Sequence, residues 1–438
     1  MGEERILLKS HGMSAKPHSP LSIPERWVLL ALLVATILKV TWAVTSAGSA
    51  DALLFYEFAK HTEAIGLNAM YVVDPRFNHT PFTGCLNVAL FALADGDYRS
   101  FSFVFRLMGI VADIAVVLGL LQMRRVIGKP AAWALALFAA SPVSIMISGF
   151  HGNVDPVMIA LMFFAAVACL NQHALFCGVL FGLACNIKIV PILFAPVFFF
   201  FWLHRGNAWR FVLPAGALMV GGLSLPLLQV PGAYLQNVFG YGSLWGVWGV
   251  SYWLRQSGWD EVQRLGYIGL SPIQTKIATG LKLGIVLGIS ALGWRRRCLR
   301  PEAVFATLAG SWMIFFALVP GVGTQYMVWF APFVLLLSPR WFVALTATST
   351  LFLGVFYHLC SPNQFPWFLA IPKPDDVPIG CAVANVTWLA IIALIAAKWR
   401  ELWMIPLDET TAAARRETSV EKQDEALLAG TMSAGAAS

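Results

Sequence analysis

The stretch "WVLLALLVATILKVTWAV" (27–44) decides the class of this protein. A membrane-spanning helix needs about 20 predominantly apolar residues, and this run meets that requirement with Lys39 as its single charge. The following "SAGSA" (46–50) resembles a signal-peptide cleavage site. The run is nevertheless longer than the roughly 7–15 residues of a signal core and follows a long polar segment, so we interpret it as an uncleaved first span.

The same apolar character extends over the whole chain. Of its 438 residues, 58% are hydrophobic and 12% are charged, and the mean hydropathy is +0.71. This composition predicts an all-α, polytopic membrane protein. The net charge of +7 is spread over short loops, where Lys and Arg set the membrane orientation, so no nucleic-acid partner is expected. The sequence shows no phosphate-binding loop, zinc motif or nucleotide-binding domain.

About twelve transmembrane helices are expected, and the shorter apolar stretch 81–94 is ambiguous. The twelve lie near residues 27–47, 101–123, 131–149, 155–171, 174–187, 189–203, 209–230, 273–294, 302–320, 324–338, 341–360 and 380–398. If 81–94 lies on the membrane surface, the short basic loops all fall on one side, which is then cytoplasmic. We therefore expect 81–94 to be a surface helix.

This topology divides the chain into three regions. Residues 1–26 form a cytoplasmic tail, 27–398 a transmembrane domain, and 399–438 a second cytoplasmic tail whose composition favours disorder. The long outer loops are then 48–100, 231–272 and 361–379. The first of these should contain an amphipathic helix at 51–66 in addition to the surface helix.

The first outer loop contains two candidate site residues. Asp51 follows the first span directly, and a carboxylate at the membrane boundary is costly unless it is paired or used, so it is a candidate general base. The alternative is that Asp51 caps the helix that follows. In "FNHTPF" (77–82), Thr80 and Pro81 predict a helix start, while His79 is a candidate for contact with a ligand.

Two charges seven residues apart share one face of the span that contains "FRLMGIVADIAVV" (105–117). Arg106 lies near the outer boundary, where it could meet an anionic headgroup or simply extend toward the interface. Asp113 lies nearer the middle of the membrane, so it must face protein and find a partner there.

The turn "HGNVDP" (151–156) concentrates polar residues between two apolar spans. One interpretation is a helix start at Pro156, capped by Asn153 or Asp155. That interpretation does not explain His151. The other is that His151 and Asn153 line an outer-face cavity, where a helix N-terminus favours an anion.

Three more candidates enter from other spans at the same level. Lys188, in "CNIKIVP" (185–191), stands between two apolar segments, which is typical of a paired or phosphate-binding charge. Gln325 and Tyr326 follow a Gly-rich turn, where they could bind a sugar or headgroup or only pack between helices.

Taken in order, these motifs resemble the GT-C superfamily of integral-membrane glycosyltransferases. The matching stretches are Asp51 with Tyr56, Gly66 and Tyr71, then "FNHTPF" (77–82), "FRLMGIVAD" (105–113), "FHGNVDP" (150–156), "GLACNIKIVPIL" (182–193) and "TQYMVWFAPF" (324–333). They cover most of residues 51–333. The second proline that the family often has in its first turn is absent here, and no motif specifies one sugar.

The resemblance implies inverting transfer of a mannose- or glucose-like hexose from a polyprenyl- or dolichyl-phosphate donor to a glycan, glycolipid or protein hydroxyl. Asp51 would be the catalytic base. The substrate-binding residues would be His79, Arg106, His151, Asn153, Asp155, Lys188, Gln325 and Tyr326. No cofactor or divalent metal is expected, because protein cations can stabilise the leaving phosphate. The site would face the extracytoplasmic or lumenal side of a bacterial inner membrane or an endoplasmic-reticulum membrane.

The competing hypothesis is a secondary transporter or lipid flippase. Such proteins show repeats, broken helices and ionisable residues near the midplane. Here the polar residues gather at one face, and only Lys39 and Asp113 approach the interior, so the enzyme is favoured.

Overall fold

The computed structural model describes residues 22–240, 244–266, 269–361, 365–367, 370 and 377–404. Within these ranges the chain is helical and has no β-strand, only two isolated bridges, which confirms the all-α class. The helices in chain order are α1 (Ile23–Thr45), α2 (Ala50–Ile65), α3 (Leu67–Val73), α4 (Pro81–Leu93), α5 (Tyr98–Ile127), α6 (Ala132–Ala139), α7 (Pro142–Ser144), η1 (Ile145–His151), α8 (Asp155–Leu170), α9 (Ala174–Ile187), η2 (Val190–Phe194), α10 (Ala195–His204), α11 (Ala208–Gln229), α12 (Pro231–Tyr234), η3 (Leu235–Phe239), α13 (Gly249–Gln256), η4 (Asp260–Val262), α14 (Pro272–Arg296), α15 (Ala303–Leu318), η5 (Thr324–Val328), α16 (Ala331–Leu337), α17 (Pro339–Cys360) and α18 (Val377–Trp403).

Seven helices in the described ranges are long and apolar enough to cross a membrane. They are α1, the continuous α6–α7–η1 segment, α5, α11, α14, α17 and α18. Shorter apolar helices stand between them, among them α8, α9, α10 and α15. The chain is therefore a helical polytopic membrane protein, as its composition predicts, while the count of twelve spans stays a prediction.

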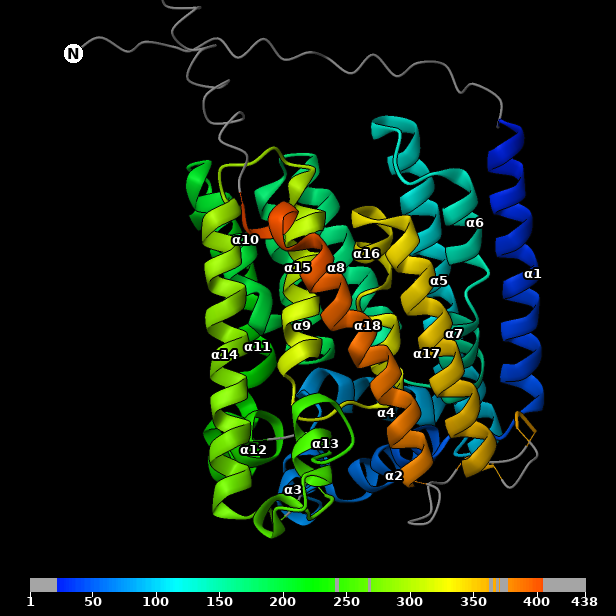
Figure 1. The fold of residues 1–438 in the computed structure, drawn as a ribbon. Helices are drawn as coiled ribbons and strands as arrows, with labels where there is room; N and C mark the ends of the chain where they lie inside the picture. The colour runs from blue at the N-terminus through cyan, green and yellow to red at the C-terminus, as the bar shows by residue number, and fades with distance from the viewer. Residues whose placement is uncertain are drawn as a thin grey trace, which may run out of the picture.

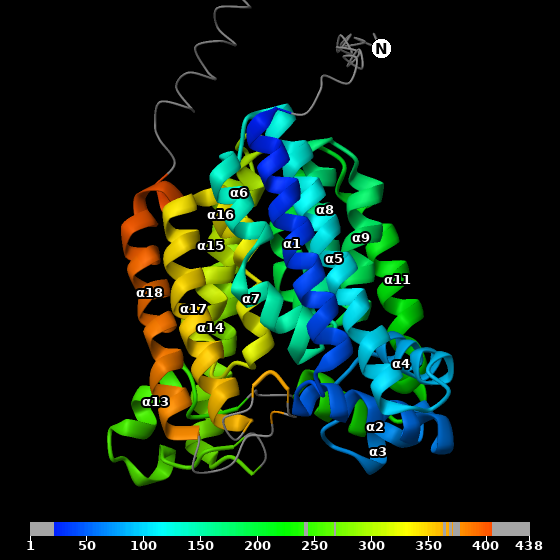
Figure 2. The same cartoon turned by 90° about the vertical axis from the view of Figure 1, so that its right-hand side faces the viewer.

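The long helices stand side by side, with the start of α1 and the end of α18 at the same end of the bundle (Figures 1 and 2). The helices α2, α3, α4 and α13 gather at the opposite end (Figure 2). The helix α4 has 13 residues, about 20 Å, which is shorter than the hydrocarbon core of about 30 Å. The helix α4 covers the stretch expected as a surface helix, and α2 covers the helix expected at 51–66, while their location on the membrane surface stays a prediction.

Parts of the expected regions lie outside the described residues, namely 1–21, 241–243, 267–268, 362–364, 368–369, 371–376 and 405–438. These include most of both expected tails and much of the third outer loop. Which end of the bundle faces the cytoplasm also stays a prediction.

A buried polar cluster joins three helices inside the bundle. The Lys39 ammonium contacts the Asp113 carboxylate at 2.6 Å, and the hydroxyls of Ser144 and Ser148 donate to the same carboxylate at 2.7 and 2.6 Å. Asp113 thus has the partner that its depth demands. A Cβ on Gly149 would come within 2.9 Å of the Lys39 backbone, so glycine allows η1 to pack tightly on α1. This packing fixes the end of η1, where the site begins.

Candidate active site

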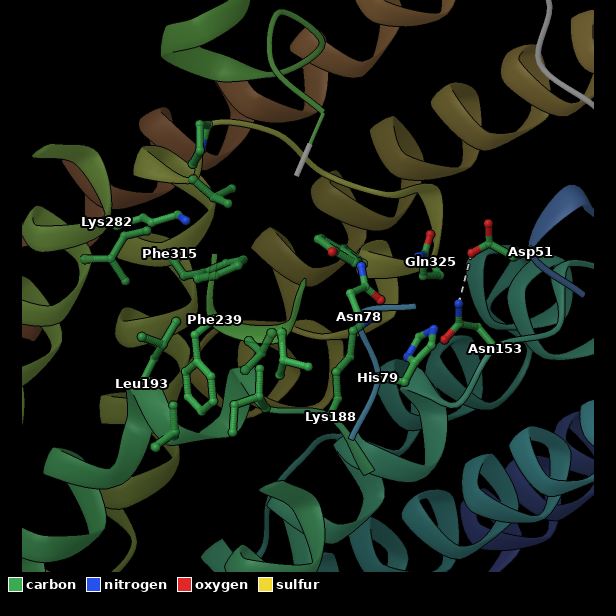
Figure 3. Close-up of a pocket in the computed structure, with 18 of the residues that line it drawn as sticks. Asp51, Asn78, His79, Asn153, Lys188, Leu193, Phe239, Lys282, Phe315 and Gln325 are labelled. Carbon is green, nitrogen blue, oxygen red and sulfur yellow. Dashed lines mark hydrogen bonds between the residues drawn. The ribbon is translucent and has the colours of Figure 1, made fainter. Parts of the chain in front are cut away.

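A cavity of about 440 Å³ lies between α2, the segment before α4, η2, η3, α14 and α15. Its polar lining residues are Asp51, Arg76, Asn78, His79, Asn153, Lys188, Lys282, Gln325 and Tyr326. Its apolar lining residues are Leu54, Phe55, Ile189, Val190, Ile192, Leu193, Val238, Phe239, Ile285, Val286, Phe315, Val319 and Pro320. Figure 3 shows Asp51, Asn153, His79 and Gln325 grouped at one end and Leu193, Phe315 and Lys282 at the other.

The first turn of α2 presents Asp51 to this cavity. The helix begins at Ala50, and its N-cap is Ser49, whose hydroxyl accepts a hydrogen bond from the Asp51 amide at 3.2 Å. Asp51 is therefore not the cap that the sequence allowed, and its side chain is available for other contacts. Ala370 pairs with this turn, because its carbonyl accepts from the Ala50 amide at 2.9 Å and its amide donates to Gly48.

The Asp51 carboxylate contacts two polar side chains and remains open to the cavity. The side-chain amide of Asn153 donates to Oδ2 at 3.0 Å, and His151 Nε2 lies 3.0 Å from the same oxygen. Burial alone would raise the Asp51 pKa, but His151, Lys188 and Asn153 together outweigh burial and hold the pKa below its ordinary 3.8. With 35% of its side chain exposed, Asp51 is an ionised carboxylate that can accept a proton from a bound hydroxyl.

His151 does not line the cavity, contrary to the expectation from sequence. Its side chain is 5% exposed and lies behind Asp51. Its Nδ1 is 2.9 Å from the Tyr357 hydroxyl, which is in turn 3.3 Å from the Thr324 hydroxyl. Its backbone carbonyl accepts a hydrogen bond from the Ser49 hydroxyl at 2.7 Å. The sequence analysis missed Tyr357, whose one signal is a polar atom within the apolar run "LFLGVFYHLC" (351–360).

Arg106 also stays out of the cavity. It is 2% exposed, and its guanidinium donates to the Ser46 hydroxyl and the Ser102 hydroxyl at 2.7 Å each. It also donates to the carbonyls of Ser46 and Gly149 at 3.1 and 3.2 Å. Instead of meeting a headgroup, Arg106 ties the end of α1 to the end of η1, and so sets the separation of Asp51 from His151.

Lys188 and Asp155 form a buried ion pair beside Asp51. Lys188 Nζ lies 2.8 Å from Asp155 Oδ1, and the two side chains are 14% and 0% exposed. Asp155 is the first residue of α8, whose N-cap is Val154, so the expectation that Asp155 caps this helix is wrong. The Lys188 ammonium also lies 4.8 Å from the centre of the Tyr326 ring and 5.1 Å from that of Trp329. Lys188 thus places a positive charge at the cavity wall, and Asp155 stabilises that charge.

His79 reaches the cavity as a neutral side chain. Burial and the nearby Lys188 charge lower its pKa to about 3, so it carries no positive charge at neutral pH. Its ring packs against Phe55 with 4.5 Å between centroids, and its carbonyl accepts from the Tyr71 hydroxyl at 2.8 Å. Thr80 is the N-cap of α4, as expected. His79 can therefore offer hydrogen bonds to a substrate but no charge.

Other lining residues were not singled out from sequence. Arg76 and Asn78 stand beside His79 in the segment before α4, and Lys282 enters from α14. Lys282 has a readable signal, since it is a lysine within the apolar run "LKLGIVLG" (281–288). Gln325 lines the cavity from the start of η5, as expected.

The model of glycosyltransferase family 87 matches residues 77–320, which is more than half of the chain. The chain belongs to this family. Family 87 consists of membrane glycosyltransferases of the GT-C type, so the superfamily resemblance is confirmed, while the mannosyl or glucosyl branch stays a prediction. No curated protein matches the chain. The family 87 match implies a sugar donor and an acceptor as substrates.

Proposed function

We propose that this family 87 glycosyltransferase moves a mannose- or glucose-like hexose from a polyprenyl-phosphate donor to an acceptor hydroxyl at the extracytoplasmic face, with inversion. One observation carries the proposal: a single cavity joins an ionised carboxylate at Asp51 to an extended apolar wall. A lipid-linked sugar needs both, because its sugar phosphate is polar and its tail is hydrocarbon. A water-soluble nucleotide-sugar would gain nothing from the apolar wall.

Two residues of the apolar wall are partly exposed. Phe239 of η3 and Val286 of α14 both line the cavity, and they are 43% and 39% exposed. Exposed apolar side chains at the apolar end of the cavity are what an opening toward lipid would require. The donor tail can pass through this opening while the sugar phosphate stays at the polar end.

The transfer balances as one displacement. The acceptor hydroxyl gives its proton to Asp51 as its oxygen forms a bond to the anomeric carbon. The bond from that carbon to the phosphate oxygen breaks, and its electron pair leaves with the polyprenyl phosphate. Lys188 and Arg76 line the cavity as cations that can meet the growing negative charge. Attack opposite the leaving group inverts the anomeric centre.

The transporter or flippase hypothesis has less support. Family membership indicates glycosyl transfer. The midplane pair Lys39 and Asp113 is held within the bundle by Ser144 and Ser148, and neither charge lines the large cavity. An ion-coupled transporter would place such residues on its substrate path.

The decisive experiment compares Asp51→Asn with Glu57→Gln in purified, lipid-reconstituted protein. Both changes are isosteric and lie on α2, but Glu57 points away from the cavity and contacts His61 at 3.8 Å. Loss of a general base removes about 10²–10⁴ of the rate, so Asp51→Asn should lose that much transfer while Glu57→Gln keeps wild-type turnover. Full activity of Asp51→Asn would refute the assignment of the base.

The donor class is tested with the same wild-type preparation. Labelled mannose and glucose are offered on polyprenyl phosphate and, in parallel, on nucleoside diphosphates. Transfer only from the lipid-linked form is expected. Transfer from the nucleotide-sugars alone would overturn the proposed donor and leave the role of Asp51 to be judged by its own variant.

A further inference from the structure

Three side chains form a line of hydrogen bonds behind the proposed base. Asp51 Oδ2 and His151 Nε2 are 3.0 Å apart, and His151 Nδ1 and the Tyr357 hydroxyl are 2.9 Å apart. Thr324 lies beyond Tyr357 at 3.3 Å. Tyr357 is 1% exposed and comes from α17, and the catalytic cavity does not include it. The hydrogen bond of Tyr357 toward the site therefore runs through His151.

The proton positions along this line are coupled. A neutral imidazole carries one N–H, and the nitrogen that keeps the proton is set by what the other nitrogen contacts. If the Tyr357 hydroxyl donates to Nδ1, then Nε2 carries the proton and donates to Asp51. The Tyr357 hydroxyl has one proton and two possible acceptors, and its contact with Nδ1 at 2.9 Å is shorter than its contact with the Thr324 hydroxyl at 3.3 Å, which favours donation to His151. The Thr324 hydroxyl then donates to the Tyr357 oxygen and no longer accepts from it. In the opposite arrangement, Nδ1–H donates to Tyr357, which donates to Thr324, and an unprotonated Nε2 faces the carboxylate.

The first arrangement suits a base, because two donors then converge on one carboxylate oxygen. Asn153 and His151 both reach Oδ2, which stabilises the ionised form and leaves Oδ1 for the acceptor hydroxyl. In the second arrangement two lone pairs would face each other across 3.0 Å unless Asp51 were protonated, and a protonated Asp51 is no base.

We propose that Tyr357 is a positioning residue that holds His151 as its Nε2–H tautomer, so that His151 donates to Asp51 and keeps it ionised for proton abstraction. This inference rests on the proposed function, since it assumes that Asp51 is the base. It adds a residue from α17, more than 300 positions away from Asp51 in the chain, to the machinery of transfer.

The groups that face Asp51 come from several elements. Each of five side chains interacts electrostatically with Asp51. They are His151 at the end of η1, Lys188 after α9, Asp155 at the start of α8, His79 before α4, and Tyr357 on α17. A change at Tyr357 alone leaves the other four in place. A shift in the pH profile of the Tyr357 variant can therefore be assigned to the His151 contact.

Tyr357→Phe is the informative variant, because it removes one oxygen and keeps the ring. The ring packs on Phe150 and Phe365 at centroid distances of 5.2 and 5.5 Å, so folding should survive. We expect kcat to fall about tenfold, in line with the loss of one buried hydrogen bond, and both KM values to stay unchanged. The acid limb of kcat/KM should move to higher pH, because Asp51 loses a donor to its charged form.

Thr324→Val is the matched control. If Tyr357 donates to His151, removing the Thr324 hydroxyl leaves that bond intact, and the pH profile should stay that of the wild type. If Tyr357 instead donates to Thr324, the variant removes the acceptor of that hydrogen bond, and the pH profile should change. An altered acid limb in Thr324→Val, with an unaltered one in Tyr357→Phe, would overturn the proposal.

Nitrogen-15 NMR of histidine-labelled protein in lipid bilayers reads the tautomer without any activity. The signal of His151 is assigned by its absence in His151→Asn. An Nε2–H signal at neutral pH in the wild type that changes in Tyr357→Phe supports the proposal, and an Nδ1–H signal in the wild type overturns it. The activity of Asp51→Asn is measured in a separate assay. An incorrect assignment of Asp51 as the base and an incorrect assignment of the His151 tautomer therefore give different results.

Discussion

The catalytic role of the Lys188 charge can be measured without a loss of stability only if Asp155 is changed together with Lys188. The two side chains are 2.8 Å apart, and Asp155 is fully buried. Lys188→Met alone therefore leaves an uncompensated buried carboxylate, which costs about 3–5 kcal/mol of unfolding free energy. Lys188→Met with Asp155→Asn removes both charges at nearly constant volume, and we expect it to recover most of that loss.

The double variant then reports the role of the charge in donor use. A hydrogen bond to a charged group is worth about 1.5–3 kcal/mol, so kcat/KM for the lipid-phosphate donor should fall about tenfold to a hundredfold. The acceptor KM should stay close to wild type, because Lys188 is expected to meet the phosphate and not the acceptor. Both expected effects on the kinetics follow from the loss of the Lys188 charge at the cavity wall.

Two measurements decide the matter. Thermal unfolding of the purified proteins gives the stability order wild type, double variant, single variant. Initial rates at saturating acceptor give the donor kcat/KM of the double variant. Wild-type donor kinetics in a stable double variant would show that Lys188 serves only to neutralise Asp155. A single variant as stable as the wild type would contradict the buried ion pair itself.

Three further outcomes are expected. Cysteines placed at Asn78 and at Asp97 should both be labelled from outside the cell, since we expect that α4 between them does not cross the membrane, and labelling of the first alone would reverse the topology downstream. Because the Asp51 pKa lies below 3.8 and His79 titrates near 3, kcat/KM should stay level from neutral pH to about 4.5 and fall only at lower pH; an acid limb near pH 6 would contradict this. Prolonged treatment with a metal chelator should leave transfer unchanged, because protein cations are expected to stabilise the leaving phosphate, and activity restored only by a divalent ion would refute that expectation.

The positions of the helices could be predicted because apolar length is a local property. The runs expected at 174–187 and 155–171 are α9 at Ala174–Ile187 and α8 at Asp155–Leu170. The preference for Pro at a helix start placed the beginning of α4 at Pro81. Charge in the short loops predicts that 81–94 does not cross the membrane, and α4 lies toward the same end of the bundle as α2 and α3, while its relation to the membrane stays a prediction.

Helix caps were a weaker inference, because several residues in one turn can serve equally well. The sequence places Asp51 and Asp155 at the expected starts of helices, where capping is an alternative role for each. In the structure Ser49 caps α2, and Asp155 is already inside α8 with its carboxylate on Lys188. Local preference could not show that each carboxylate has a partner elsewhere in the chain.

The sequence by itself determined that this is a helical membrane protein with polar side chains in the segments that meet at one end of the bundle, and it named Asp51 as the base we propose. Tertiary structure alone decided which polar residues face the cavity. Arg106 and His151 are turned away from it, and Tyr357 stands behind His151. The reason is distance along the chain, since Asp51 and His151 are 100 residues apart and His151 and Tyr357 are 206 apart. Hydropathy places a side chain at a depth in the membrane, but only the packing of α1, α5, η1 and α17 fixes the direction in which it points.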